Sequence, residues 1–128
     1  DTYVDKEGGI VYKMNNLIHT GSFYKLFIRL MQHNKLFPQT AYVLVGFTGY
    51  KGRTIYPLLA QRYIEKAHPA DVSDIQNYMT SLGFTQIDEW TYKADKIIIS
   101  DLKPKNVLQD SDGDLYVIDA EIKSEKNV

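Results

Sequence analysis

The side chains best suited to chemistry are concentrated in one acidic stretch, residues 100–121, with the sequence SDLKPKNVLQDSDGDLYVIDAE. Two sets of residues there, which span overlapping parts of the sequence, could each form a site. One set has the spacing of positions 1, 3, 5 and 12 of a calcium-binding loop: Asp110, Asp112, Asp114 and Glu121. The other set has the spacing of a phosphoryl-transfer site: Asp101, Lys103, Asn106 and Asp119.

The calcium set departs from the pattern that such loops require. A glycine is needed at position 6, where this chain has Leu115, and the nearby Gly113 stands at position 4. Helices flank calcium loops of this type, whereas alternating apolar residues flank this stretch and predict strands. Asp, Ser and Gly favour tight turns. We therefore interpret residues 110–114 as the turn of a hairpin.

The second set contains the parts that phosphoryl transfer requires. One carboxylate receives the proton of the attacking hydroxyl, and a nearby cation offsets charge on the transferred group. One or two carboxylate or amide ligands bind Mg²⁺ together with phosphate oxygens and water. These residues lie on both sides of the predicted hairpin turn, and the hairpin holds the two strands in register.

The N-terminal half of the chain predicts two pairs of strands that flank one helix. Residues 2–5 and 10–14 surround the turn Gly8-Gly9 and predict a hairpin. Two further strands are predicted at residues 41–47 and 54–60. Pro57 indicates an edge position or a bulge in the second of these, because proline cannot donate to a sheet ladder.

The intervening helix is predicted between His19 and Pro38. Thr20 or Ser22 can cap its start, and Pro38 stops it. The helix contains no Asp or Glu. Its apolar face follows the i, i+3, i+4, i+7, i+8 pattern: Phe23, Leu26, Phe27, Leu30 and Met31.

The C-terminal half begins with a polar connector at residues 61–69, where the chain leaves the preceding strand. A second helix is predicted at residues 71–82, with Gly83 as its C-terminal stop. A short strand pair within 85–96, a buried strand at 97–100 and the hairpin of 106–119 follow. The charged tail, 123–128, is expected to fray. This order of elements predicts an α+β fold. The apolar face of the second helix is predicted to contain Val72, Ile75, Met79 and Leu82.

Composition restricts the functional class. The 128 residues are 44% hydrophobic and 24% charged, which fits one soluble globular domain. No apolar run approaches the roughly 20 residues of a membrane span, and a net charge of −1 gives no general attraction to nucleic acid. The chain has no Cys and no signal peptide, so a cytoplasmic location is expected. Because it starts at Asp1, it is expected to be a processed or excised piece.

The stretch DLKPKNVL followed by VID resembles the catalytic loop and the metal-binding strand of protein kinases. Asp119 falls 13 residues after Asn106, as in kinases. The whole chain resembles the short kinase-like domains of polyvalent proteins from phages and mobile elements. Three segments have counterparts there: residues 33–38, 60–64 and 78–84.

The resemblance implies a role for each matched residue. Asp101 would be the catalytic base, and Lys103 would neutralise charge at the γ-phosphate. Asn106 and Asp119 would hold magnesium, and Lys13 would anchor the phosphates of ATP. The backbone of a hinge would bind adenine, with the residues Gln61, Arg62 and Tyr63.

The resemblance also implies a fold: a truncated, two-lobed kinase-like domain with a small antiparallel sheet plus helix, a hinge and a reduced C-terminal lobe. An N-lobe-like part would span 1–60, the hinge 61–69 and a reduced C-lobe-like part 70–128, all within one minimal domain. The implied ligands are ATP and Mg²⁺, and the implied activity is transfer of the γ-phosphate to a Ser, Thr or Tyr hydroxyl of a protein.

Several features depart from the kinase pattern. Ile99-Ser100 replaces the usual His-Arg, and Asp119-Ala120-Glu121 replaces Asp-Phe-Gly. No glycine-rich phosphate loop is visible, the first helix has no acid to pair with Lys13, and nine residues follow Asp119. The alternative function is therefore an inactive kinase-like interaction module, a pseudokinase. It would act through partner binding or homodimerisation on its tyrosine-rich surface.

Overall fold

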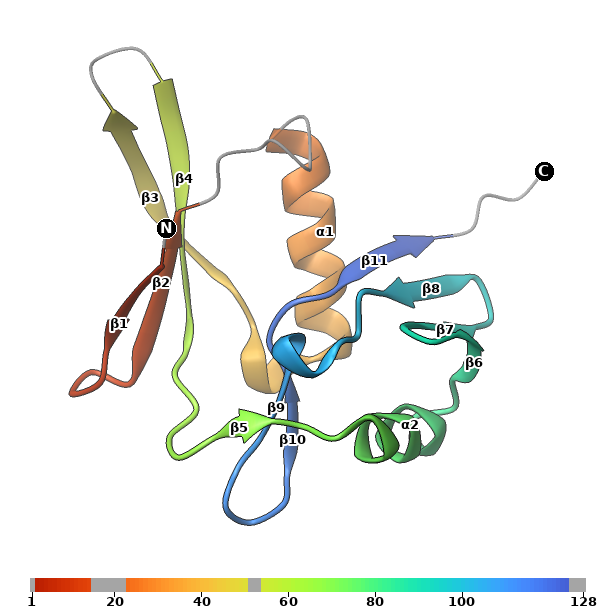
Figure 1. Ribbon diagram of the computed structural model, residues 1–128. Coiled ribbons are helices and arrows are strands. Elements are labelled where there is room, and N and C mark those ends of the chain that lie inside the picture. Colours follow the sequence, from red (N-terminus) through yellow and green to blue (C-terminus); the bar gives the residue numbers. More distant parts are fainter. Residues whose placement is uncertain (1, 15–22, 51–53, 125–128) are drawn as a thin grey trace. The chain divides into compact units, whose positions relative to one another are not determined.

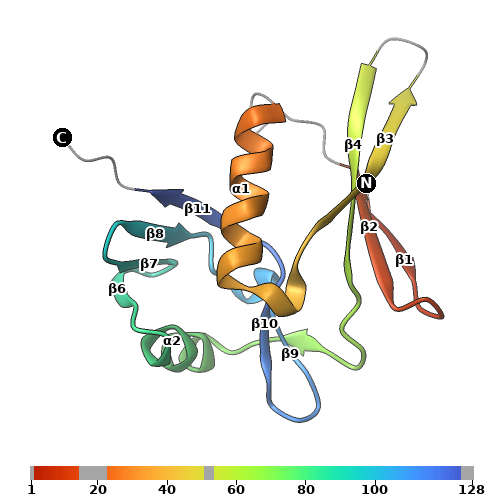
Figure 2. The same cartoon turned by 180° about the vertical axis from the view of Figure 1, so that it is seen from behind.

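The computed structural model describes residues 2–14, 23–50 and 54–124. The chain divides into two compact units, Asp1–Glu65 (unit 1) and Lys66–Val128 (unit 2), and Figures 1 and 2 follow it from opposite sides. Both units combine a helix with antiparallel strands. The predicted α+β class is therefore confirmed.

Unit 1 contains a four-stranded antiparallel sheet. Its strands are β1 (Thr2–Asp5), β2 (Ile10–Met14), β3 (Val43–Tyr50) and β4 (Thr54–Arg62), in the order β1-β2-β4-β3. Both predicted strand pairs are confirmed, because β1 pairs with β2 and β3 pairs with β4. The other edge of β4 pairs with β2, which places Lys13 opposite Leu59.

Two details of β4 correct the sequence analysis. Pro57 does not lie in an edge strand, because β4 stands between β2 and β3. The described pairing with β2 ends at Leu58, so Pro57 is the first residue beyond that ladder. The register shift of this strand pair lies in β3, between Leu44 and Gly46. In addition, β4 continues through Arg62, two residues past its predicted end, because the ladder with β2 extends to the pair of Arg62 and Ile10.

The helix α1 (Phe23–Leu36) ends where the sequence predicts, and Pro38 opens the short 3₁₀ helix η1 (Pro38–Thr40). The buried residues of α1 are Leu26 and His33. The predicted apolar face is therefore only partly correct, since Met31 is 66% exposed while the polar His33 is 2% exposed. The predicted capping residues, at positions 20 and 22, lie outside the described residues.

Unit 2 contains a helix and two small antiparallel sheets. The first sheet has the order β10-β9-β5 and includes the predicted hairpin: β5 (His68–Pro69), β9 (Val107–Gln109) and β10 (Leu115–Val117). The second sheet has the order β11-β8-β7-β6: β6 (Thr85–Asp88), β7 (Thr91–Ala94), β8 (Ile97–Ser100) and β11 (Glu121–Ser124). The short strand pair predicted within residues 85–96 is confirmed as β6 and β7.

The helix α2 (Val72–Ser81) is closed at its C-terminus by a glycine, as predicted. Gly83 has φ +92°, and the next N–H, of Phe84, donates to the Met79 carbonyl at 3.0 Å. This left-handed glycine and six-to-one hydrogen bond are those of a Schellman motif. Of the predicted apolar face, Ile75 and Met79 are buried, whereas the two terminal members, at positions 72 and 82, are exposed.

The tail forms more structure than the sequence predicts. Residues 123 and 124 were expected to fray, but they belong to β11, which pairs with β8. Ile122 explains the pairing, because its side chain is only 6% exposed and lies opposite the fully buried Ile99. Among the helices of the described ranges, none combines the length and the apolar character that crossing a bilayer requires.

A substitution at Gly83 tests the closure of α2. We expect Gly83→Ala to lower the free energy of unfolding by about 1 kcal/mol, because a Cβ disfavours a left-handed backbone. A Cβ at Gly83 would meet no atom within 4 Å, so the effect isolates the backbone. Urea denaturation measures it. Gly46→Ala is the matched control, since Gly46 also has open space but no positive φ. Equal stability of the two variants would contradict the prediction.

Candidate functional site

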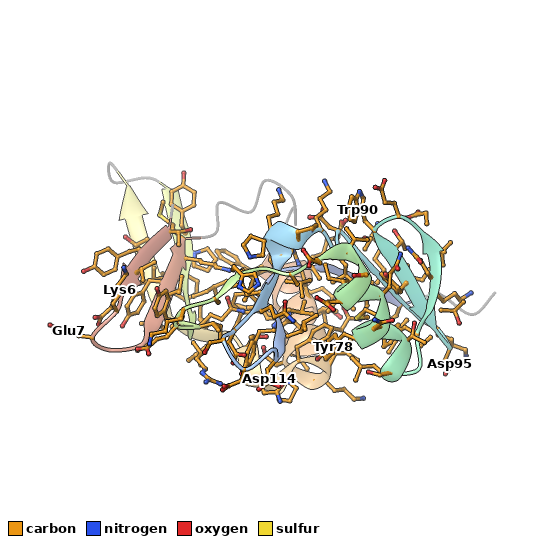
Figure 3. The ribbon with its side chains drawn as sticks, turned by 60° about the horizontal axis from the view of Figure 1, so that its bottom comes forward. Lys6, Glu7, Tyr78, Trp90, Asp95 and Asp114 are labelled. Carbon is orange, nitrogen blue, oxygen red and sulfur yellow. The ribbon has the colours of Figure 1, made fainter. Side chains whose placement is uncertain are left out.

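The loop that carries Asp101, Lys103 and Asn106 is held at both ends by buried apolar residues. It follows β8, passes through the 3₁₀ helix η2 (Pro104–Asn106) and enters β9. Leu102 is 1% exposed and Val107 is completely buried. The Leu102 N–H donates to the carbonyl of Trp90 at 3.1 Å. Trp90 lies in the turn between β6 and β7 and is labelled in Figure 3. The loop is thus anchored to two different sheets of unit 2.

Asn106 fixes the conformation of Asp101. The Asn106 side chain is 6% exposed. Its Nδ2 atom donates to the Asp101 carbonyl oxygen at 2.7 Å and to the Asp101 carboxylate at 3.1 Å. Asp101 has φ +63°, in the left-handed region that Asp adopts more readily than most residues. The amide therefore compensates a conformation that an L-residue otherwise disfavours.

The backbone of Asn106 also places Asp119. The Asn106 carbonyl accepts hydrogen bonds from the N–H groups of Ile118, at 2.9 Å, and Asp119, at 3.4 Å. One residue separates Asp119 from β11, where Glu121 lies opposite Ser100. Because Ser100 precedes Asp101, this register brings the two ends of the sequence motif together. One residue thus contacts both carboxylate-bearing positions.

Lys103 completes the group of residues that the sequence analysis selected in unit 2. Its Nζ lies 3.4 Å from a carboxylate oxygen of Asp101, and the two side chains are 43% and 45% exposed. An ion pair this exposed contributes little to stability. The lysine is therefore positioned near Asp101 without being fixed there, which suits a cation that must reach a ligand.

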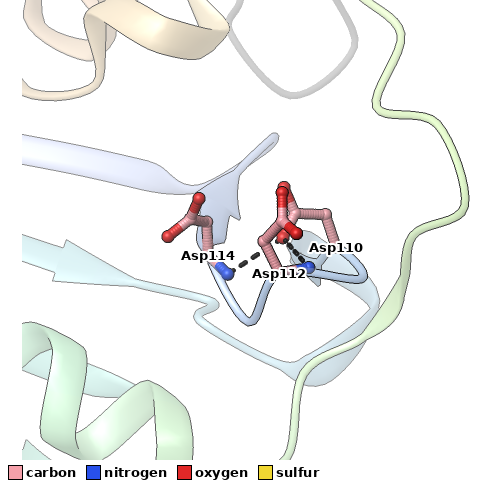
Figure 4. Close-up of side chains that lie close together, drawn as sticks. All are labelled: Asp110, Asp112 and Asp114. Carbon is pink, nitrogen blue, oxygen red and sulfur yellow. Dashed lines mark hydrogen bonds between the residues drawn. The ribbon is translucent and has the colours of Figure 1, made fainter.

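The acidic turn forms a separate feature, drawn in Figure 4. Asp110, Asp112 and Asp114 bring carboxylate oxygens within 4.8 Å of one another. One carboxylate oxygen of Asp110 accepts the N–H groups of Asp112 at 3.0 Å and Asp114 at 2.9 Å. The hairpin interpretation is confirmed, since β9 and β10 pair on either side. Glu121, the remaining member of the calcium set, lies in β11 of the other sheet.

The hydrogen bonds in this turn shift the pKa of Asp110. Partial desolvation is the largest single influence and raises the pKa. The hydrogen bonds from the Asp114 N–H, the Tyr116 hydroxyl and the Asp112 N–H together outweigh it. The pKa of Asp110 therefore lies below its usual value, because these donors stabilise the ionised carboxylate.

Unit 1 holds Lys13 and the predicted adenine-binding residues. The Lys13 Nζ donates to Gln61 Oε1 at 3.0 Å and to the Tyr42 hydroxyl at 3.5 Å. It also lies 5.3 Å from the centre of the Tyr42 ring, within the range of a cation–π contact. Sequence reasoning missed both side-chain partners. The available signal was a glutamine two residues after Leu59 in an apolar strand, which places it on the same face as the buried leucine.

The three residues predicted to form the hinge are joined to the β1–β2 hairpin. Gln61 and Arg62 pair with Val11 and Ile10, and the Tyr63 N–H donates to the Gly9 carbonyl at 2.9 Å. β3 pairs with β4 only as far as residue 60. The Gln61 side chain is 4% exposed, so its side chain, and not only its backbone, belongs to the candidate site.

A comparison with protein families assigns the chain to one of them. The family described as "Serine/Threonine/Tyrosine Kinase found in polyvalent proteins" matches residues 1–126. The chain belongs to this family. Neither the curated proteins nor the solved structures gave a significant match. The suspected kinase-like domain is therefore confirmed as a family assignment that covers almost the whole sequence.

A substitution at Asn106 tests how the loop is held. We expect Asn106→Asp to lower the free energy of unfolding by about 2 kcal/mol, because a carboxylate would replace a donor that faces two oxygens of Asp101. Thermal or urea unfolding measures the effect at neutral pH. Asn77→Asp, at an exposed position of α2, is the matched control. If the two variants were equally stable, Asn106 would not hold Asp101.

Acid titration tests the turn. The native pKa of Asp110 is below its unfolded value near 3.8, so its stabilising contribution is present above that value and is lost as the pH falls through the native pKa. We expect Asp110→Asn to be less stable than the wild type near pH 6, and the difference to shrink toward pH 2. Urea unfolding over this range measures it, with the exposed Asp112→Asn as control. A constant difference would contradict the prediction.

Proposed function

We propose that this chain is a Mg-ATP-binding kinase-like domain that transfers the γ-phosphate to a Ser, Thr or Tyr hydroxyl of a protein. The observation that carries the proposal is the placement of Asp101 and Asp119 by the single residue Asn106. The two carboxylates need distinct roles in phosphoryl transfer, one toward the nucleophile and one toward the metal. Membership of the kinase family supports this assignment.

The side chains near Asp119 fit a magnesium ion in their chemistry. Asn106 donates its two described side-chain hydrogen bonds through Nδ2, so its Oδ1 atom remains the ligand-type oxygen of the amide. Asp119 supplies a carboxylate, and its backbone N–H donates to the carbonyl of the same Asn106. One amide and one carboxylate oxygen form a donor set that Mg²⁺ accepts together with phosphate oxygens and water. When bound, the ion would offset charge on the phosphates.

Asp101 and Lys103 are proposed to act on the transferred group. The Asp101 carboxylate is half-buried and oriented by Asn106, so it can orient an acceptor hydroxyl and receive its proton. Lys103 lies beside it and supplies a positive charge for the γ-phosphate. Its exposure leaves the lysine able to exchange one oxygen partner for another.

Lys13 is proposed to bind the nucleotide phosphates, and the backbone of residues 61–63 to bind adenine. The proposed domain division is an N-lobe-like part at 1–60, a hinge at 61–69 and a reduced C-lobe-like part at 70–128. The boundary between the two compact units, after Glu65, falls within that hinge and supports the division. The family relation supports the two-lobed kinase-like arrangement.

The proposal predicts that Mg-ATP stabilises the wild type and that Asp119→Asn and Asp101→Asn affect different steps. Asp119→Asn should greatly reduce the ATP-dependent rise in melting temperature in the presence of Mg²⁺. Asp101→Asn should retain that rise and lose phosphate transfer to a mixed Ser/Thr/Tyr peptide library by roughly a hundredfold or more. Asn is chosen because it tolerates the left-handed φ of Asp101, whereas Ala would add backbone strain.

The matched control is Asp112→Asn, which removes an exposed carboxylate of the hairpin turn. It should bind nucleotide and transfer phosphate like the wild type. A wild type without any ATP-dependent stabilisation would remove nucleotide binding and with it the proposal. Binding without transfer would leave the pseudokinase alternative.

The interaction-module alternative is supported by one feature of unit 1. The strand β3 lies at the edge of its sheet and exposes apolar side chains: Val43 at 61%, Val45 at 53% and Phe47 at 55%. Exposed apolar edges are a common site of strand pairing with another chain. Sedimentation that gave a stable dimer, together with no response to Mg-ATP, would favour this function over phosphate transfer.

A further inference from the structure

A buried chain of hydrogen bonds connects the helix α1 to Lys13. The Nε2 atom of His33, on α1, lies 3.0 Å from the carbonyl oxygen of Thr40. The Gln61 Nε2 atom donates to the same carbonyl at 2.8 Å. The Gln61 Oε1 atom accepts from Lys13 at 3.0 Å. His33, Thr40 and Gln61 are between 1% and 4% exposed, so water does not substitute for these contacts.

We propose that Gln61 is the positioning residue of Lys13, and that Thr40 and His33 fix Gln61 in turn. This inference rests on the proposed function only in the role of Lys13 as the phosphate-binding lysine. It answers a question raised by the sequence, since α1 carries no acidic residue that could pair with Lys13. The helix reaches the lysine instead through a backbone carbonyl and an amide.

This series of hydrogen bonds requires an amide side chain at position 61. Toward Lys13 the side chain must accept, because an ammonium group only donates. Toward Thr40 it must donate, because a carbonyl oxygen only accepts. A glutamine satisfies both requirements with one oxygen and one nitrogen. A glutamate would place a carboxylate oxygen against the Thr40 carbonyl and would repel it.

The contact between Gln61 and Lys13 involves no opposite charge. A carboxylate in the same place would form an ion pair with the lysine, whereas Gln61 orients it through a neutral acceptor. Tyr42 adds a hydroxyl and a ring face, which are also neutral. The Tyr42 backbone is fixed by two hydrogen bonds with the Asn34 side chain, at 2.7 and 2.9 Å. Gln61 and Tyr42 therefore orient the ammonium group of Lys13 without either of them forming an ion pair with it.

The first arm of the test measures Lys13 without any nucleotide. The full chain is treated with acetic anhydride at limiting concentration, and acylation of each lysine is followed by mass spectrometry. Gln61→Leu should increase the acylation rate of Lys13 several-fold, because the amine loses a hydrogen-bond acceptor. The exposed Lys105 is the internal reference and should not change. Gln39→Leu, at an exposed residue of η1, is the matched control.

A second variant keeps this arm decisive if Gln61→Leu fails to fold. Gln61→Glu retains an acceptor for Lys13 while it loses the donor to Thr40. Lys13 should therefore be acylated no faster in Gln61→Glu than in the wild type, although the melting temperature of the variant should be lower. Faster labelling of Lys13 in Gln61→Glu, or unchanged labelling in a folded Gln61→Leu, would overturn the inference.

The second arm measures the affinity for ATP with Mg²⁺ and for adenosine. Gln61→Leu should weaken ATP binding by roughly tenfold, the scale of one hydrogen bond to a charged group, and adenosine binding by less than about twofold. Equal weakening of both ligands would indicate a general structural role and would contradict the inference. A wild type that binds neither ligand, with Lys13 labelling still controlled by Gln61, would refute the proposed function and leave the positioning role intact.

Discussion

The candidate site of unit 2 depends on Asn106, which forms hydrogen bonds through both its side chain and its backbone. Its side-chain amide holds Asp101 in a left-handed conformation, and its backbone carbonyl holds the segment that ends at Asp119. A short polar residue is needed, because the amide must reach the backbone of a residue only five positions earlier. Burial strengthens the requirement, since a buried donor without a partner is destabilising. Several other features of unit 2 keep this residue in place.

Those features are apolar and non-local. Leu102 and Val107 anchor the loop on either side of Asn106, and both are almost completely buried. The pairing of β11 with β8 returns the chain beside the start of the loop. Ile122 stabilises that return with a buried side chain. The polar site is therefore supported by a hydrophobic frame from two sheets, so the few polar contacts need only orient it.

Local patterns predicted much of the fold but failed where tertiary contacts decide. The hairpins, the C-terminal ends of the two helices and the α+β class follow from turn residues, prolines and periodicity. Met31 fits the apolar period of α1 and is nevertheless exposed, while His33 is buried because Thr40 supplies hydrogen-bond partners. The tail residues look too polar for a strand, yet β11 forms because β8 offers an edge next to Ile122.

The sequence by itself determined which residue types stand at which spacing: Asp101, Lys103, Asn106 and Asp119 around one hairpin, and the family that this spacing indicates. The tertiary structure decided how those residues are held. The Gln61 side chain contacts Lys13 across 48 positions of sequence. No local pattern encodes such a contact, because it arises only when β2 and β4 pair and bring one face of each strand together. Spacing along the chain therefore indicated the family, and strand register decided which of these side chains meet.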